Sequence, residues 1–445
     1  MKKAVLFFII VIFLGAGTLC AETLSLEQVR VLALANSRSL AKYDLSIKSS
    51  LLDERNQLYS MLPVLSAGYS ASMNYLQNWD FVNPADTFKA GATFSVTQKI
   101  FEGGKNLIQR SLNSIATESV RNEALAEYYN VLDSADSAYY AVLEAAASLE
   151  AADSALQSAV AGLNIAEIRQ SNGMINQGDY MKALADKEDR ENSRNQARRN
   201  LTLNQTKLKS LISAQAIPEL DQIDFSGYGD LISSLGNISD EEADSLYNRF
   251  WKLLAAANPS LVRANLNNIR AEKNLTLTKR GYSPTISATV FSTALNYTPA
   301  NNFTNTASGG VSITGSIPLD FWVLSNRVEK SKIALESAAL DYANTENQLE
   351  IDLQTTLINT FTQAESVLSS VRSLEYTQKH FDYIEERYRL SQSSVSELGD
   401  ASTLLINSRN SLIRARFGFL QSLSKLRSLL VIDDEEKLIS MLMGN

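Results

Sequence analysis

A proline-free stretch from Asn106 to Asn172 constrains the fold of this chain more than any other feature. It holds 67 residues and a single glycine, Gly162. Two apolar stripes with a seven-residue repeat run along it: Ala135, Val142, Leu149, Leu156 and Leu163, and Ala138, Ala145, Ala152, Ala159 and Ala166. This spacing is typical of a coiled coil, and the alanine stripe allows close backbone approach. The stretch predicts a helix on the order of 100 Å long, more than a compact domain needs.

The N-terminus predicts export. Two lysines precede an apolar run and then small residues, a pattern typical of a secretory signal peptide over residues 1–21. Cleavage is expected after Ala21. The alternative, a lipid anchor on Cys20, is disfavoured because the leucine before this cysteine fits a lipobox poorly, and the sequence alone leaves it open.

Composition excludes several classes of function. The net charge of −8 becomes −10 once the two lysines of the signal are removed, which argues against nucleic acid as a partner. Cys20 and His380 are the only cysteine and histidine, so thiolate and histidine-cluster metal sites and most histidine-based catalysis are excluded. We therefore expect neither an enzyme nor a bound metal or cofactor. With no methionine cluster either, dedicated copper or silver export is disfavoured.

The prolines reveal an internal duplication. Two long proline-free tracts, 85–217 and 319–445, alternate with shorter regions that hold all seven prolines. The distance from Leu40 to Pro63 is 23 residues, and so is that from Leu261 to Pro284. Because element order and spacing recur together, we infer two structural repeats.

The predicted organisation follows from this duplication. It comprises a signal peptide (1–21), a first repeat (22–240), a second repeat (241–430) and a C-terminal tail (431–445). Each repeat should hold a helix, two strands and a pair of long helices. In the first repeat these are a helix over 25–62, strands at about 64–76 and 87–100, long helices at about 105–213 and an irregular segment at 214–240. In the second, strands are expected at about 285–297 and 307–319, and long helices at about 325–430.

The strands alternate apolar and polar residues over about twelve positions and are rich in aromatic residues. Crossing a membrane as part of a β-barrel takes roughly 9–11 residues per strand. The alternative interpretation is a pair of soluble hairpins, each with one buried face. If the strands do enter lipid, four of them cannot close a barrel and open edges are not tolerated there. Several copies of the chain would then have to share one barrel.

The arrangement resembles the TolC-like outer-membrane efflux protein family over residues 22–430. The resemblance includes the Leu62–Pro63 pair, the strand-to-helix turn from Gln98 to Gly104, and the segment from Tyr388 to Leu404. The chain departs from the family pattern at Ser391, where glycine is usual, and at Glu397, which replaces aspartate.

This resemblance implies a mainly α protein with a transmembrane β-barrel part. It implies a homotrimer with a 12-stranded barrel in outer-membrane lipid, a periplasmic α-helical barrel, and a mixed belt formed by residues 205–260 and the tail. The expected function is an exit duct for tripartite efflux or type I secretion. The expected partners are a periplasmic adaptor (membrane fusion) protein and an inner-membrane transporter. The alternative is an exported coiled-coil structural or adhesive protein without channel activity.

The resemblance also suggests site residues near 172–179 and 391–400, where the paired helices turn. The turns that would dock the adaptor contain Asn172, Gly173, Asn176, Ser391 and Ser394. The channel constriction is assigned to Asp400 and Glu397, and gating of the tip to a bond between Asp179 and Tyr388.

Each of these residues also has a simpler interpretation. Ser394 and Glu397 form a capping box, and Asp179 suits the start of a helix. Tyr388 lies on the apolar seam and could be a core residue. The arginine that assists the gate in the family is replaced by Ser393, for which Arg387 and Arg389 are candidate substitutes.

Overall fold

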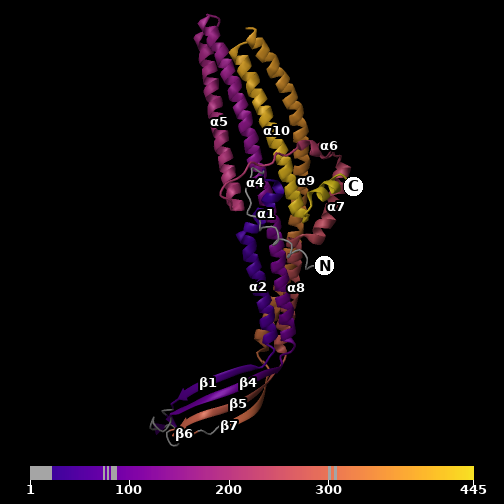
Figure 1. Cartoon of the computed structure of the whole chain (residues 1–445). Coiled ribbons are helices and arrows are strands. Elements are labelled where there is room, and N and C mark those ends of the chain that lie inside the picture. Colours follow the sequence, from indigo (N-terminus) through magenta and orange to yellow (C-terminus); the bar gives the residue numbers. More distant parts are fainter. Residues whose placement is uncertain are drawn as a thin grey trace. The chain divides into compact units, whose positions relative to one another are not determined.

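The computed structural model describes residues 23–73, 76–77, 80–81, 88–298, 302–304 and 308–444, so the predicted signal peptide lies outside the described residues. The chain forms two compact units (Figure 1). Unit 1 comprises residues up to 38, 128–256 and 351 onwards, and unit 2 comprises 39–127 and 257–350. Within the described part, no helix combines the length and apolar character needed to cross a membrane.

As predicted, the chain contains two copies of the same series of elements: a helix, a pair of strands and a pair of long helices. The α-helices are α1 (Leu26–Asn36), α2 (Arg38–Tyr59), α4 (Lys105–Ser171), α5 (Gln177–Ile212), α6 (Gly229–Gly236), α7 (Asp240–Ala257), α8 (Pro259–Lys279), α9 (Phe321–Arg389), α10 (Val395–Leu430) and α11 (Glu435–Leu442). Two short 3₁₀ helices are η1 (Phe225–Tyr228) and η2 (Arg280–Tyr282). The strands are β1 (Val64–Ser72), β2 (Leu76–Gln77), β3 (Asp80–Phe81), β4 (Lys89–Phe101), β5 (Thr285–Thr298), β6 (Asn302–Thr304) and β7 (Ser308–Ser316).

Besides the short strands β2 and β3, which the sequence did not predict, three longer segments differ from the sequence-based expectation. The first helix is divided at Ser37, whose backbone is extended and ends α1 before α2 begins. The segment 214–240, expected to be irregular, contains η1 and α6, because Leu231, Ile232 and Leu235 give α6 one buried face. The tail contains α11, which buries Leu438 and Leu442 in the same way.

Five strands of unit 2 form one antiparallel sheet: β1 pairs with β4, β4 with β5, and β5 with both β7 and the short β6. β2 and β3 form a separate two-stranded sheet. Residues directly opposite each other share a face, and the two faces differ in chemistry. One apolar row crosses β1, β4, β5 and β7, with every member exposed: Leu65, Val96, Val290 and Val311. On the other face, Ser66 and Ser95 hydroxyls lie 2.7 Å apart, and those of Thr97 and Thr289 lie 3.1 Å apart.

The sheet joins the helices of unit 2 at a tight junction. Gly103, in the turn between β4 and α4, has a φ of +64°, and a Cβ built there would lie 2.3 Å from Cβ of Ser283. The rings of Tyr282 and Phe321 stack with centroids 6.3 Å apart. Gln98 donates to the carbonyl oxygen of Met61 at 3.1 Å. The ends of α2, β4 and η2 and the start of α9 therefore meet at one level.

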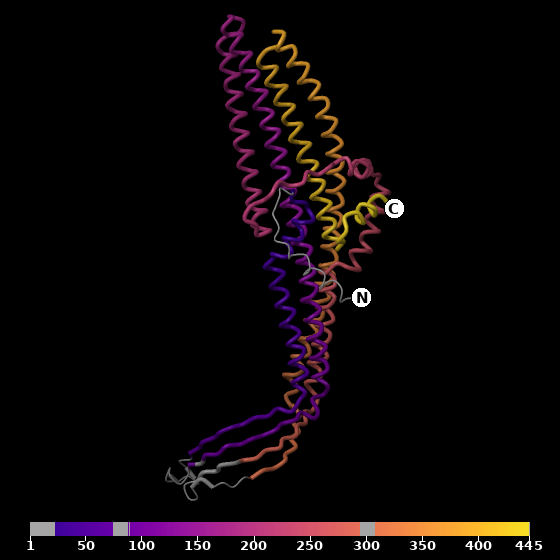
Figure 2. Tube along the Cα trace, viewed as in Figure 1, coloured from indigo at the N-terminus to yellow at the C-terminus, as the bar shows by residue number. Residues whose placement is uncertain are grey.

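In unit 1, the long helices α4, α5, α9 and α10 run side by side (Figure 2). The predicted seam on α4 is buried at five of its positions: Ala135, Val142, Ala145, Ala159 and Ala166. Polar contacts also link the helices. Arg194 of α5 pairs with Asp153 of α4 at 2.8 Å, and Arg409 of α10 donates to Gln378 of α9 at 2.8 Å.

A buried network of ion pairs joins α1, α4, α10 and α11 in unit 1. The carboxylate of Asp136 on α4 is completely buried, and it accepts from Arg30 of α1 at 2.6 and 3.0 Å and from Arg427 of α10 at 2.7 Å. Ser424 donates to it at 2.6 Å. Arg30 also pairs with Glu435 of α11 at 3.3 Å, which ties the C-terminal helix to the same cluster. Burial lowers the pKa of Arg30, but the hydrogen bonds and charge of Asp136, together with the charge of Glu435, outweigh burial and raise it.

Candidate functional site

The two turns between long helices have the same construction. In the first, Gly173 follows the end of α4 with a φ of +70°, and Asn176 caps α5 by accepting from the amide of Asp179 at 2.9 Å. In the second, Ser391 follows α9 with a φ of +62°, and Ser394 caps α10. The bond from the amide of Gln392 to the carbonyl of Arg387 (2.7 Å) mirrors the bond from Met174 to Arg169 (2.8 Å) in the first turn.

Ser391 stands where the family usually has glycine, yet the backbone at this position is still in the left-handed conformation. Serine adopts there the left-handed conformation that glycine adopts at position 173, at a cost that glycine would avoid. Glu397 completes the predicted capping box, since its side chain accepts from the amide of Ser394 at 2.8 Å while its own amide donates to the Ser394 hydroxyl at 3.2 Å. Asn172 is the residue that links α4 to Gly173 in the first turn.

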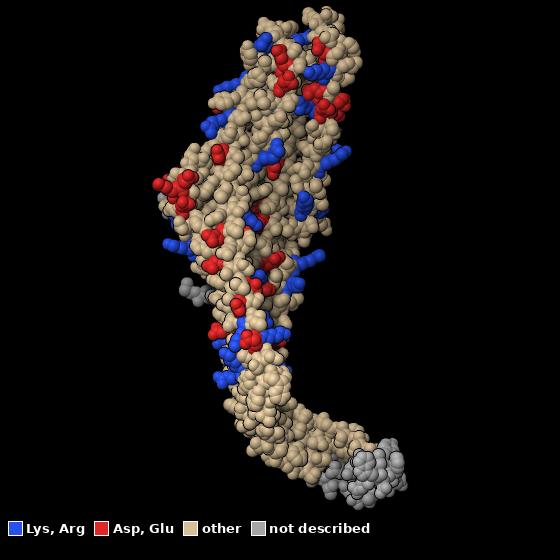
Figure 3. Space-filling model, turned by 180° about the vertical axis from the view of Figure 1, so that it is seen from behind, with Lys and Arg blue, Asp and Glu red and all other residues tan. Residues whose placement is uncertain are grey.

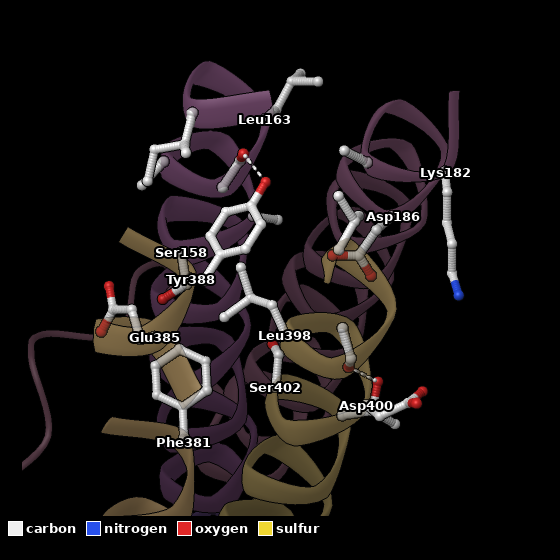
Figure 4. A pocket seen from close by; sticks show the side chains of 18 of the residues that line it. Ser158, Leu163, Lys182, Asp186, Phe381, Glu385, Tyr388, Leu398, Asp400 and Ser402 are labelled. Carbon is white, nitrogen blue, oxygen red and sulfur yellow. Dashed lines mark hydrogen bonds between the residues drawn. The ribbon is translucent and has the colours of Figure 1, made fainter. Parts of the chain in front are cut away.

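Tyr388 is a core residue. Its side chain is completely buried in a cluster with Ala166, Ala183 and Val395. Figure 4 shows its ring between the helices, with the hydroxyl directed at the carbonyl oxygen of Gly162, 3.5 Å away. The expected bond to Asp179 is not formed among the described residues. Burial raises the pKa of Tyr388; the charge of Asp179 also raises it, and that of Arg169 lowers it.

An arginine does accompany Tyr388, but it is not one that the sequence suggested. The guanidinium carbon of Arg169, on α4, lies 4.2 Å from the centre of the Tyr388 ring, a cation–π contact. Arg387 instead donates to the carbonyl of Gln392 at 2.6 Å, and Arg389 donates to Glu385 at 3.0 Å. Among the described residues, neither makes a hydrogen bond or an ion pair with Tyr388 or Asp179. Ser393, at the family position, is buried and donates to the carbonyl of Ile384 at 3.2 Å.

The internal duplication is the sequence feature that could have pointed to Arg169. Arg169 and Arg387 occupy equivalent positions in the two repeats, two turns before their caps. Only Arg169 contacts Tyr388, because the helix that carries Arg387 also carries Tyr388. No spacing within one repeat reveals such a contact.

Two cavities lie at this end of unit 1. One, of about 360 Å³, is lined by residues of both turns, including Arg169, Asp179 and Glu397. Atom Nη2 of Arg169 is buried without a hydrogen-bond partner in the described structure. The second, of about 210 Å³, lies between the four helices and is lined by Tyr388 and Asp400 (Figure 4).

The carboxylate of Asp400 takes no part in a helix cap or an ion pair of the described structure, and neither does that of Asp179, whose backbone amide alone is bonded. Asp400 is exposed on α10, its side chain points away from the ring of Tyr388 (Figure 4), and no hydrogen bond or ion pair with another described residue holds its carboxylate. Within the described ranges, no cluster of three or more histidine, cysteine, aspartate or glutamate residues is suited to a metal ion.

We expect the ring of Tyr388, and not its hydroxyl, to hold this region together. Tyr388→Phe should leave it intact because the hydroxyl bond is long, whereas Tyr388→Ala should destabilise it by about 3–5 kcal/mol through the cavity left behind. Limited trypsin digestion at the turn arginines would measure this. Equal cleavage of the two variants would show that the hydroxyl is the essential group.

The sequence profile of the outer membrane efflux protein family matches residues 29–214 and 251–430, which is more than half of the chain. The chain belongs to this family. As an outer membrane efflux protein it is an outer-membrane channel protein and not an enzyme. No curated protein matches the sequence.

Solved structures share the fold of this efflux protein at low sequence identity. The outer membrane protein VceC from Vibrio cholerae superimposes with a TM-score of 0.75 at 15% identity, covering 91% of this chain and 95% of that one. A membrane protein from Pseudomonas aeruginosa gives 0.77 at 16% identity, covering 92% and 91%. The CmeC outer membrane channel from Campylobacter jejuni gives 0.74 at 14% identity, covering 94% and 89%.

Proposed function

We propose that three copies of this chain pool their sheets into one 12-stranded barrel and act as the exit duct of a tripartite efflux or type I secretion system. In this proposal the signal peptide is removed and the helices extend into the periplasm. A periplasmic adaptor protein and an inner-membrane transporter deliver the exported molecule.

The sheet that contains β1, β4, β5 and β7 carries this proposal. β1 and β7 each pair on one side only within the described residues, so each sheet presents two open edges. An open edge in lipid leaves backbone groups without hydrogen bonds, at several kcal/mol each. Pairing β7 of one copy with β1 of the next removes both edges. The apolar row from Leu65 to Val311 then faces lipid, and the serine and threonine face lines the lumen.

Exposed apolar stripes on the helices of unit 2 support contacts between copies. α2 buries no residue, yet it exposes Leu45, Leu52 and Tyr59 at seven-residue intervals. α9 exposes Ile333 and Leu340 at the same interval. A heptad stripe without a partner in its own chain is suited to packing against another helix of the same kind.

The equivalent turns of unit 1 are the proposed docking site for the adaptor. Both begin with a residue in the left-handed conformation and end in a capped helix start, and together they line one cavity. The alternative function, a structural or adhesive protein, explains the helices but gives no role to a sheet with an exposed apolar row across four strands and two open edges.

Asp400 should set the ion preference of the channel. Three copies of an exposed carboxylate around a narrow pore concentrate cations and bind divalent ions. In planar-bilayer recordings, Asp400→Asn should reduce both cation preference and block by divalent ions, with little effect on folding. Glu397→Gln is the control, since it removes a carboxylate of the same turn while glutamine can keep the capping box, as Gln28 does at the start of α1. Unchanged selectivity in Asp400→Asn would place the constriction elsewhere.

A further inference from the structure

We propose that a basic collar at the junction of sheet and helices in unit 2 binds the phosphate groups of anionic phospholipids, in the membrane leaflet that faces the helices. The collar comprises Lys99, Lys105, Lys279, Arg280 and Arg327. This inference rests on the proposed function, because it requires the sheet to span the membrane.

Charged side chains end abruptly at this junction. No residue from Gly281 to Leu319 is charged, and neither is any residue of β1. Among the strands of this sheet only β4 carries charged residues, Lys89 and Lys99. On the face that Figure 3 shows, no charged side chain is visible on the described part of the sheet, and the adjoining helix ends carry a band rich in lysine and arginine.

The collar residues belong to segments that contact one another. The β4–α4 turn meets the end of η2 at Gly103 and Ser283, and η2 meets the start of α9 through the stacked rings of Tyr282 and Phe321. Lys99 and Lys105 flank the first contact. Lys279 and Arg280 immediately precede Tyr282, and Arg327 lies six residues, about 9 Å of helix, after Phe321.

Two acidic residues lie at the junction: Glu102 is neutralised by Lys99, whereas Asp320, directly before Phe321, has no ion-pair partner among the described residues and offsets one of the collar's cations. Glu102 pairs with Lys99 at 2.8 Å and accepts from Asn106 at 2.7 Å, and the bond from Lys99 is the main reason that the pKa of Glu102 is lowered. Lys105, Lys279, Arg280 and Arg327 have no ion-pair partner among the described residues. Lys105 is half-buried, and the other three are exposed.

Aromatic side chains place the collar at the depth of lipid headgroups. Phe321 and Trp322 are exposed beside Tyr282, and tyrosine and tryptophan concentrate where the hydrocarbon of a membrane meets water. Cations just beyond such a belt reach lipid phosphates. α4 and α9 also begin here, and the positive end of each helix dipole favours an anion. Because the collar borders the apolar row of the sheet, a lipid is favoured over an acidic protein as its ligand.

The test compares lipid preference in reconstituted membranes. The full mature protein is placed in vesicles with spin-labelled phosphatidylglycerol or phosphatidylcholine, and the fraction of immobilised lipid is measured. The test variant combines Lys105→Gln, Lys279→Gln, Arg280→Gln and Arg327→Gln. The control removes four exposed cations of unit 1: Arg198→Gln, Arg199→Gln, Lys207→Gln and Lys252→Gln.

The unmodified protein and the control should prefer phosphatidylglycerol, with a preference that falls as salt rises. A cation at an anionic surface contributes about fivefold, so the test variant should lose at least about tenfold of that preference. Equal binding of the two lipids by the unmodified protein would overturn the inference, as would equal losses in both variants. Removal of the preference by millimolar inorganic phosphate would assign the collar to free phosphate instead.

Conductance recorded from the same vesicles separates the two proposals. A protein that conducts ions but shows no lipid preference contradicts the collar alone. A protein that neither inserts nor conducts contradicts the proposed function.

Discussion

Asp136→Ala is expected to destabilise the helices of unit 1 by about 3–5 kcal/mol, the loss that follows when one member of a buried ion pair is removed. Asp136 is completely buried and compensates two buried arginines, Arg30 and Arg427. Without it both guanidinium groups lose their main partner, and α1, α4 and α10 lose their common contact. Thermal unfolding of the purified protein, followed by circular dichroism, would measure the effect.

Asp133, one turn earlier on α4, is the matched control. Burial raises the pKa of Asp133, so the folded state disfavours its charge. Because its pKa is raised, the contribution of Asp133 to the free energy of unfolding is greatest below the usual aspartate pKa of about 3.9 and is lost as the pH rises through the folded-state pKa. Asp133→Asn should therefore be neutral or stabilising at pH 7, with no advantage at acidic pH. A loss as large as that of Asp136→Ala would contradict the special role of Asp136.

Gly103→Ala should disrupt the junction between sheet and helices. Two costs add: about 1–2 kcal/mol for a side chain at a φ of +64°, and about 1–3 kcal/mol for the overlap with Ser283. Gly104→Ala has only the first cost, because its φ is +75° but nothing lies within 4 Å of the added Cβ.

Removing the side chain of Ser283 should restore much of the stability that Gly103→Ala loses. In the double variant with Ser283→Gly, the overlap disappears, and stability should return toward that of Gly104→Ala. The yield of folded, detergent-stable protein and its melting temperature measure the series. If Gly103→Ala and Gly104→Ala behave alike, the close approach to Ser283 is unimportant.

The sequence predicted the features that depend on local periodicity. Alternation along β1 and β7, the heptads of α4 and the duplication were sufficient to predict the repeated order of helix, strand pair and long helix pair, but not the division at Ser37, α6 or α11. Prediction was poorest where stability comes from contacts distant in sequence. Nothing local indicates that Asp136 meets residues 106 positions before it and 291 after it.

The candidate site also combines features that the local sequence predicts with features that depend on contacts distant in sequence. The caps of Asn176 and Ser394 are local motifs, and the structure contains both. The environment of Tyr388 depends on how the two repeats pack, which brings Arg169 to its ring and leaves Arg387 and Arg389 in other contacts. The role of Asp400 requires the arrangement of several copies around a pore, so it stays a prediction.

The central claim is that several copies of this chain share one barrel, because one copy leaves two sheet edges open. The mass of the detergent-solubilised complex, measured by native mass spectrometry, tests this most directly. We expect three mature chains in each complex. A single chain that stays monodisperse in solution without detergent would contradict the account.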